Sequence, residues 1–303
     1  MKKYIALLLM LAMLVSLAAC GDVAGGELLP PVGNGSESGS ESGSEGGSAV
    51  QTPAEVTVEP VVLLEQDGLK IQAKELDTDG FMGAELKLLI ENNTDKNLTV
   101  QCRNSSVNGY MVETMMSAEV AAGKKANDAI TFLSSDMELC GIETIADMEF
   151  SFHIYTTDDW DTYLDSDQIQ LKTSAADTYS YTYDHPGELV YEGKGVKVVA
   201  LGLNKDESLF GPGLVLYIQN TSDKAITVQS RDTSVNGFMV DTIFSQELMP
   251  GKHAVTDVTF MESDLEENDI TSIEELELSF HIYNSETWKT IVDTDAVKLS
   301  FAE

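Results

Sequence analysis

Basic residues are scarce in this sequence, whose 303 residues include 18 Lys and Arg against 51 Asp and Glu. The first 19 residues hold two of the lysines and no acid, so the remaining chain has 16 basic residues and a net charge of −35. A surface of this sign repels the phosphate backbone of nucleic acids and the headgroups of anionic lipids. We therefore expect no nucleic-acid partner, and we expect any membrane attachment to depend on a covalent lipid.

Enzyme motifs are also missing. The sequence contains no HExxH or HxH pair, no GxSxG stretch and no Gly-rich phosphate loop. Two of its four histidines, His153 and His281, occupy equivalent outward strand positions beside Tyr155 and Tyr283, which favours a surface structural role over catalysis. We predict a protein that is not an enzyme and has neither a catalytic residue nor a cofactor.

The acidic run "TTDDWDTYLDSD" is a candidate calcium site because its carboxylates offer oxygen ligands. Its copy, "NSETWKTIVDTD", places Lys289 where Asp161 stood and lacks the Gly and Glu of an EF-hand loop. A solvated acidic loop is the favoured interpretation, with weak calcium binding left open, so we predict no metal site. Trp160 and Trp288 are kept in both copies. We expect them to pack at the base of the loop, and an exposed platform for glycan stacking is the alternative.

The longest apolar run lies at the N-terminus. Lys2 and Lys3 precede a largely apolar stretch, Tyr4 to Ala19, which is shorter than the roughly 20 residues that span a bilayer as a helix. Such a run with a small-residue end is typical of a secretory signal peptide. Its ending, "LAAC", resembles a bacterial lipobox, whose cysteine is acylated. We predict a signal peptide at residues 1–19, lipidation at Cys20, and an extracellular protein anchored to the outer face of the bacterial cell membrane.

Residues 20–58 are rich in Gly, Ser and Glu, as in "GNGSESGSESGSEGGS". A segment with so few apolar residues cannot form a core, which predicts a disordered tether. A flexible chain of about 38 residues has a root-mean-square reach of roughly 35 Å. We therefore expect the tether to hold the folded part away from the membrane.

The rest of the sequence is an internal repeat. "TVQCRNSSVNGYMVE" and "TVQSRDTSVNGFMVD" share ten of fifteen residues, and their offset of 128 continues without a gap from Asn92–Leu171 to Asn220–Leu299, where 37 of 80 pairs are identical. Each unit has about 110 residues, a normal domain size. We predict two domains, residues 59–173 and 188–303, that fold independently and are joined by a short polar linker at 174–187.

Apolar and polar residues alternate within each unit. In "MEFSFHIY", Phe150, Phe152 and Ile154 fall on one face, and Phe280 and Ile282 repeat the pattern in the second copy. This alternation is the signature of strands with one buried face. About seven or eight short strands per unit predict an all-β fold, with two tandem antiparallel β-sandwich domains. "SSDMELCGIETI" and "ESDLEENDITSI" are each expected to hold a short helical turn.

The repeated stretch contains a turn signal and an arginine. Asn108-Gly109 and Asn236-Gly237 supply the positive φ that a tight hairpin turn requires. Arg103 and Arg231 are notable in so acidic a chain. We expect each of them to form an intramolecular salt bridge, and recognition of a ligand is the alternative.

These motifs carry a family resemblance. The stretches "NNTDKNLTVQ", "SVNGYMV", "AAGKKA" and "FSFHIY" resemble the tandem immunoglobulin-like domains of uncharacterised surface lipoproteins from Gram-positive gut bacteria. The resemblance covers both units. It implies an immunoglobulin-like (Ig-like) sandwich outside the membrane, and it implies no activity and no catalytic residues.

Besides Cys20, the sequence has only Cys102 and Cys140, and the second unit has Ser230 and Asn268 at these positions. Both cysteines are present in one copy and absent from the other, as expected for a bonded pair. A disulfide persists outside the membrane. Closing a loop of 39 residues would contribute about 4 kcal/mol in the chain-entropy model. We predict a disulfide between Cys102 and Cys140, with two free thiols as the alternative.

Two functions fit these features. The first is a lipid-anchored, non-enzymatic binding or adhesion module that engages an unidentified protein or glycan through loops or strand edges. The second is a structural or accessory lipoprotein of a membrane or envelope complex with no ligand of its own. The sequence alone does not identify which residues would bind a ligand.

Overall fold

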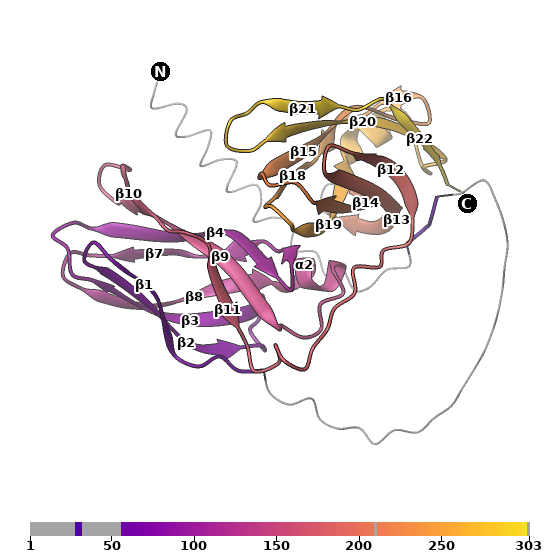
Figure 1. Cartoon of the computed structure of the whole chain (residues 1–303). Coiled ribbons are helices and arrows are strands. Elements are labelled where there is room, and N and C mark those ends of the chain that lie inside the picture. The colour runs from indigo at the N-terminus through magenta and orange to yellow at the C-terminus, as the bar shows by residue number, and fades with distance from the viewer. Residues whose placement is uncertain (1–27, 32–55, 209–210, 302–303) are drawn as a thin grey trace, which may run out of the picture.

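The computed structural model describes residues 28–31, 56–208 and 211–301 (Figure 1), and their regular secondary structure is almost entirely β-strand. The predicted signal peptide, the lipidation site at Cys20 and most of the predicted tether lie outside the described residues. No helix in the described ranges is long and apolar enough to cross a membrane.

The first repeat contains strands β1 to β11 and one short helix. Their bounds are β1 Val61–Gln66, β2 Leu69–Asp77, β3 Gly83–Asn92, β4 Leu98–Val107, β5 Tyr110–Met111, β6 Thr114–Met115, β7 Ser117–Val120, β8 Lys125–Leu133, α2 Ser134–Leu139, β9 Asp147–Thr156, β10 Thr162–Asp165 and β11 Ile169–Lys172.

The second repeat contains strands β12 to β22 and a matching helix. Their bounds are β12 Glu188–Gly193, β13 Val196–Ser208, β14 Gly211–Asn220, β15 Ile226–Val235, β16 Phe238–Met239, β17 Thr242–Ile243, β18 Ser245–Leu248, β19 His253–Phe260, α3 Glu262–Glu267, β20 Glu275–Asn284, β21 Thr290–Asp293 and β22 Val297–Ser300. Both helices start within the segments that the sequence assigns to helical turns, so that prediction is confirmed.

Each repeat supplies two sheets with the same strand order. In the first repeat, β1-β2-β3-β8-β6 form one sheet, and β4 lies between β9 and the short strands β5 and β7 in the other. The second repeat matches these with β12-β13-β14-β19-β17 and with β15 between β20 and the short strands β16 and β18. Every strand pairing within a repeat is antiparallel among the described residues. The prediction of an all-β, sandwich-like fold is confirmed at this level.

The core of each repeat lies between its two sheets. Leu86 and Leu88 of β3 are fully buried and belong to one hydrophobic cluster with Phe150 and Phe152 of β9. A second cluster joins the corresponding strands of the second repeat. The period-two pattern therefore predicts the buried face correctly, because alternate side chains of a strand point to opposite faces.

The Asn-Gly turns are formed as the sequence predicts. Asn108 and Gly109 have φ of 50° and 83°, and Asn236 and Gly237 have φ of 50° and 86°. This left-handed conformation costs little for Gly and is tolerated by Asn. The Asn108 side chain also accepts a hydrogen bond from the Ala146 backbone N–H at 2.8 Å, so it fixes the turn to the start of β9.

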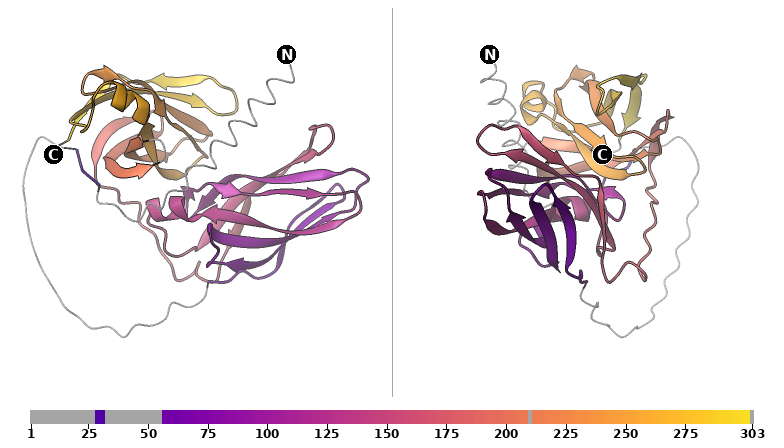
Figure 2. Two further views of the ribbon diagram at one scale, coloured as in Figure 1. Left: turned by 180° about the vertical axis from the view of Figure 1, so that it is seen from behind. Right: turned by 60° about the vertical axis from the view of Figure 1, so that its left-hand side comes forward.

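One sheet runs through both repeats, because β5 of the first repeat pairs in parallel with β19 of the second. The His253 backbone N–H donates to the Gly109 carbonyl at 3.0 Å, and Lys252 Nζ lies 2.7 Å from Glu149 Oε1 at the same boundary. Figure 1 and Figure 2 agree that the repeats lie side by side and meet at the end of the first repeat that carries α2. The two predicted units are therefore in direct contact as well as being joined by the linker.

The linker itself packs between the repeats. The Tyr181 hydroxyl donates to the Cys140 carbonyl, and the Tyr183 hydroxyl donates to the Asn108 carbonyl at 2.7 Å. Tyr183 is also stacked on His253 of the second repeat, so the linker forms part of the interface although the surrounding sequence is polar.

A short piece of the predicted tether is ordered. Leu29 forms an isolated bridge with Leu203 of β13, through N–H···O distances of 3.2 and 2.9 Å, and Pro31 forms a bridge with Phe301. A Cβ on Gly202 would lie 2.6 Å from the Leu29 carbonyl oxygen, so the close approach depends on this glycine. The prediction of a tether without structure is wrong for residues 28–31, whose leucines pack on the cores of the repeats.

Candidate functional site

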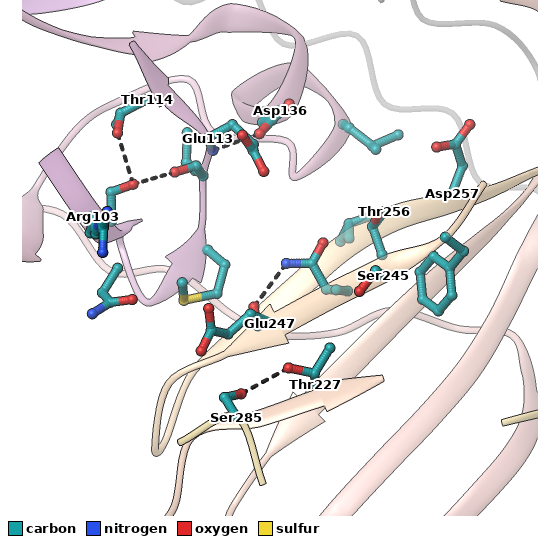
Figure 3. A pocket seen from close by; sticks show the side chains of 18 of the residues that line it. Arg103, Glu113, Thr114, Asp136, Thr227, Ser245, Glu247, Thr256, Asp257 and Ser285 are labelled. Atoms are coloured by element: carbon teal, nitrogen blue, oxygen red, sulfur yellow. Dashed lines mark hydrogen bonds between the residues drawn. The ribbon is translucent and has the colours of Figure 1, made fainter. Parts of the chain in front are cut away.

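A cleft of about 860 Å³ opens between the two repeats. Its first wall comes from β4, β6 and α2, and its second wall comes from β15, β18, β19 and the end of β20. Figure 3 shows Glu113 and Asp136 on the first wall across from Ser245 and Thr256 on the second. The cleft exists because β5 pairs with β19 next to it, so it belongs to neither repeat alone.

Three carboxyl groups line the cleft, of which Asp136 and Asp257 are half-buried and Glu113 is exposed. The Glu113 backbone N–H donates to Asp136 Oδ2 at 2.7 Å, which holds the helix α2 against the start of β6. Burial raises the pKa of Asp136 and of Asp257 on β19. Desolvation, followed by the charge of Asp136, raises the pKa of Glu113. These groups are therefore able to accept hydrogen bonds from ligand hydroxyls or amines in a partly dry environment.

Hydroxyl groups and apolar side chains, among them Phe244 and Val255, share the remaining surface. Ser105 Oγ donates to the Val112 carbonyl at 2.7 Å and lies 3.3 Å from Thr114 Oγ1, while Thr227 Oγ1 and Ser285 Oγ are 2.9 Å apart on the opposite side. Each hydroxyl carries a donor and two acceptor sites, so each pair keeps capacity for a further hydrogen bond. The lining suits a ligand that has both hydroxyl groups and an apolar face.

An exposed tryptophan stands at the loop after β9 and at the equivalent loop after β20. Trp160 is 61% exposed and Trp288 is 75% exposed, and each is stacked on a tyrosine, Tyr155 or Tyr283, with centroids 5.3 and 5.6 Å apart. The expectation that both tryptophans pack in a loop base is wrong. Of the two, Trp288 lines the cleft.

The backbone of both tryptophans is strained. Their φ angles are 63° and 58°, in the left-handed region that bulky residues rarely adopt. Holding such a residue there costs about 1–3 kcal/mol. The Trp288 N–H donates to the Asn284 carbonyl at 2.9 Å, which closes the tight turn that presents the ring. Both copies therefore keep a strained turn that exposes an aromatic face.

The arginines differ from expectation. Arg103 lines the cleft and donates from Nη2 to Gln101 Oε1 at 3.3 Å. No ion pair within the described ranges involves Arg103 or Arg231, so the predicted salt bridges are not formed. Arg103 therefore keeps its charge available to a ligand in the cleft.

Cys102 and Cys140 are free thiols, so the predicted disulfide is not formed. The two sulfur atoms have different partners, because Cys102 on β4 bonds to the Thr114 side chain and Cys140 after α2 bonds to the Val255 backbone. Burial raises the pKa of Cys102 to about 11 and that of Cys140 to about 12. Although Cys102 lines the cleft, it is protonated at neutral pH and is a poor nucleophile.

The strand histidines lie where the sequence predicts. His153 and His281 are on the outward faces of β9 and β20, and their Nδ1 atoms lie 2.5 Å from Asp165 and Asp293. Neither histidine lines the cleft, although His281 lies beside Tyr283, which does. No group of three or more His, Cys, Asp or Glu side chains in the described part of the chain is arranged to hold a metal.

An aromatic cluster at the junction escaped the sequence reasoning. Tyr110 Oη lies 2.5 Å from His185 Nε2, Tyr217 Oη lies 2.5 Å from His253 Nδ1, and Tyr183 is stacked on His253. Burial lowers the pKa of both histidines, to about 4 for His253. The alternation of Tyr and His in "TYSYTYDH" was a signal for this cluster, since every second residue of an extended segment points the same way.

Comparisons with known proteins give little information. No family model matches the sequence, and no curated protein matches it. Among solved structures, that of the YadV chaperone is similar over 77% of this chain and 100% of the chaperone, with 13% sequence identity and a TM-score of 0.24. A similarity at this level carries no argument about function.

Proposed function

We propose that this protein is a lipid-anchored extracellular binding module, with two Ig-like sandwich domains that together present a carbohydrate site. The ligand occupies the cleft between the repeats and stacks on Trp288. The lipid on Cys20 keeps the module at the outer face of the membrane. The chain does no chemistry on the ligand.

The observation that carries this proposal is the exposed Trp288 at the cleft. An indole ring that is 75% exposed forgoes most of its hydrophobic stabilisation, and its turn is strained as well. Stacking on Tyr283 keeps the ring flat against the protein, with 16° between the planes. A rigid, flat aromatic surface beside hydroxyl and carboxyl groups matches a sugar ring, which has an apolar face and a hydroxyl-bearing edge.

The charges in the cleft favour binding over catalysis. Cys102 is protonated at neutral pH because its pKa is raised to about 11. None of the described residues that line the cleft is a histidine, so a nucleophile there lacks the base that commonly activates it. Neutral glycans and glycans with an amino group suit the carboxyl-rich wall, whereas a polyanionic glycan is repelled by the net charge.

A glycan array tests the proposal directly. The soluble chain from Gly21 to Glu303 is screened beside Trp288→Ala and beside Phe81→Ala, which removes an exposed aromatic side chain that does not line the cleft. We expect a defined group of glycans to bind the wild type and Phe81→Ala. The same glycans should not bind Trp288→Ala. Binding that survives Trp288→Ala, or no glycan bound at all, contradicts the proposal.

An accessory role in an envelope complex is the second candidate. It is supported by a different observation, the exposed apolar pair Phe238 and Met239 on β16, which are 48% and 66% exposed. This pair lies outside the residues that line the cleft.

A further inference from the structure

The same turn has opposite surroundings in the two repeats. In the first repeat, Tyr110 after the Asn-Gly turn is fully buried, whereas its counterpart in the second repeat, Phe238, is 48% exposed. A Cβ on Gly109 would lie 2.4 Å from the Tyr183 hydroxyl, whereas a Cβ on Gly237 meets nothing within 4 Å. Both repeats keep the turn, but the turn is covered by other residues in the first repeat and exposed in the second.

In the first repeat, this turn is the docking element of the junction. The Gly109 carbonyl accepts a hydrogen bond from the His253 N–H, and Tyr110 lies against the rings of His253 and His185. Met111 continues the contact by packing on the core of the second repeat. This hairpin tip therefore helps to attach the first repeat to the outer face of the β14–β19 sheet, together with α2, the linker and the Lys252–Glu149 ion pair.

The receiving face is specialised for this contact. Val215 and Tyr217 of β14 and Val255 of β19 are buried and pack with the core of the first repeat. At the offset of 128, the first repeat has Lys87, Leu89 and Asn127 at these positions, and Lys125 replaces His253. The first repeat therefore lacks an apolar receiving face, although it has the same strands.

We propose that the tip of the second repeat, Gly237–Met239, is a second docking element that attaches to a β-sheet domain of another protein. We call these three residues the β16 tip. Its partner presents what β14 and β19 present to the first repeat: an outward-facing apolar and aromatic strand pair, and a free backbone N–H for the Gly237 carbonyl. The inference goes beyond carbohydrate binding and does not depend on it.

Quasi-equivalence of the repeats argues for this occupant. Large apolar side chains that are exposed on both faces of one hairpin tip are candidates for an interaction surface, and Phe238 and Met239 are exposed in this way. Head-to-tail contacts of this kind propagate when a copy exposes both complementary faces. Here the receiving face of the second repeat is already covered by the first, and the equivalent face of the first carries Lys87 and Lys125. The arrangement therefore ends in a free tip that a second copy of this chain cannot receive.

The net charge of −35 adds a condition on the partner. At the junction within the chain, Lys252 of the receiving repeat pairs with Glu149. Glu277 occupies the position of Glu149 in the second repeat and lies 3.0 Å from Lys298 in the free protein. A partner with basic residues beside its apolar strands meets both requirements, because opposite charges speed encounter and set orientation.

The first experiment frees the receiving face in the full soluble chain. Tyr110→Lys places a charge in the buried junction and releases the first repeat from the β14–β19 face. That face can then bind the β16 tip of another copy. We expect the wild type to be monomeric by sedimentation velocity, and we expect Tyr110→Lys to form concentration-dependent oligomers. Adding Met239→Lys should weaken this association at least tenfold, whereas adding Phe81→Lys, an equally drastic change at another exposed site, should not.

Misfolding does not imitate this result. If Tyr110→Lys unfolds the first repeat, the second repeat still carries both faces, and non-specific aggregation would respond equally to Met239→Lys and Phe81→Lys. Oligomers that are insensitive to Met239→Lys overturn the proposal. The proposal is also overturned if Tyr110→Lys stays monomeric while its Val255 amide gains rapid hydrogen exchange. The β14–β19 face is then exposed, and no β16 tip has bound to it.

The second experiment uses the lipid-anchored wild-type chain in its own cells. A photo-crosslinking phenylalanine analogue is placed at position 238 and, as the control, at position 81. We expect one protein to be crosslinked from position 238 and not from position 81. Mass spectrometry should map its crosslinked residue to a β-strand, and the crosslinked product should disappear when Met239→Lys is added. No product above the control, a product at a helical or unstructured site, or a product with a second copy of this chain overturns the proposal.

Discussion

Acidification is expected to weaken the junction between the repeats through His253. This side chain is 6% exposed, its Nδ1 lies 2.5 Å from the Tyr217 hydroxyl oxygen, and Tyr183 covers its ring with centroids 3.8 Å apart. Burial, followed by the charges of His185 and Lys252, lowers the pKa of His253 to about 4. The neutral ring is therefore the form that the junction accepts.

The sign and size of the effect follow from this pKa. A histidine in the unfolded chain titrates near pH 6.5, so the unfolded chain binds a proton before the folded chain does as the pH falls. The contribution of the neutral His253 ring to the free energy of unfolding is complete above pH 6.5, and it is lost as the pH falls from 6.5 to about 4. At about 1.4 kcal/mol per pKa unit, the loss is about 2 kcal/mol at pH 5 and levels off at about 3 kcal/mol.

Urea unfolding at pH 7 and pH 5 measures this loss, with His253→Gln as the reference. Glutamine keeps a polar group for Tyr217 and does not titrate, and the carboxylates that titrate near pH 5 are the same in both proteins. The difference in free energy of unfolding between wild type and His253→Gln should shrink by about 2 kcal/mol from pH 7 to pH 5. A difference that stays constant refutes the reasoning.

The remaining predictions concern the cysteines and the N-terminal segment. In the native soluble protein, Cys102 and Cys140 should both resist alkylation at pH 8 and both react after denaturation, since burial raises their pKa to about 11 and about 12; a disulfide found by unreduced peptide mapping would contradict the structure. Leu29→Asp should lower the free energy of unfolding by about 2 kcal/mol, because it places a charge on the core of the second repeat. Ser38→Asp adds the same charge within the Gly/Ser/Glu-rich segment and should have no effect; equal effects of the two would contradict the docking of Leu29. Cys20→Ala should abolish incorporation of a fatty-acid probe, and labelling equal to wild type would exclude the lipid anchor.

Local patterns predict the strands and turns of this fold well. The alternation in "MEFSFHIY" identifies Phe150, Phe152 and Ile154 as core residues, and all three are buried. The Asn-Gly pairs identify both hairpin tips, because positive φ is a local property of the residues themselves. The free cysteines show the limit of such reasoning, since Cys102 and Cys140 co-occur in one repeat for separate reasons of packing.

The site is less predictable because it depends on how the repeats pair. In β14, Leu214 to Ile218 is apolar without alternation, whereas the matching stretch of the first repeat contains Lys87. That difference marks a strand buried on both faces, but it does not identify the covering element. The exposure of Trp288 was equally hidden, because a tryptophan kept in both copies is expected in a core, and only the left-handed turn places it outside.

The most direct test of the carbohydrate site is the dissociation constant of an array-selected glycan, measured by titration calorimetry for the wild type, Trp288→Ala and Trp160→Ala. The two variants remove equivalent rings with similar exposure, and only Trp288 lines the cleft. Loss of one aromatic stacking contact of about 1.4 kcal/mol corresponds to a tenfold weaker complex. The account predicts at least this weakening for Trp288→Ala and an unchanged constant for Trp160→Ala. Equal constants for all three proteins, or a loss confined to Trp160→Ala, would contradict it.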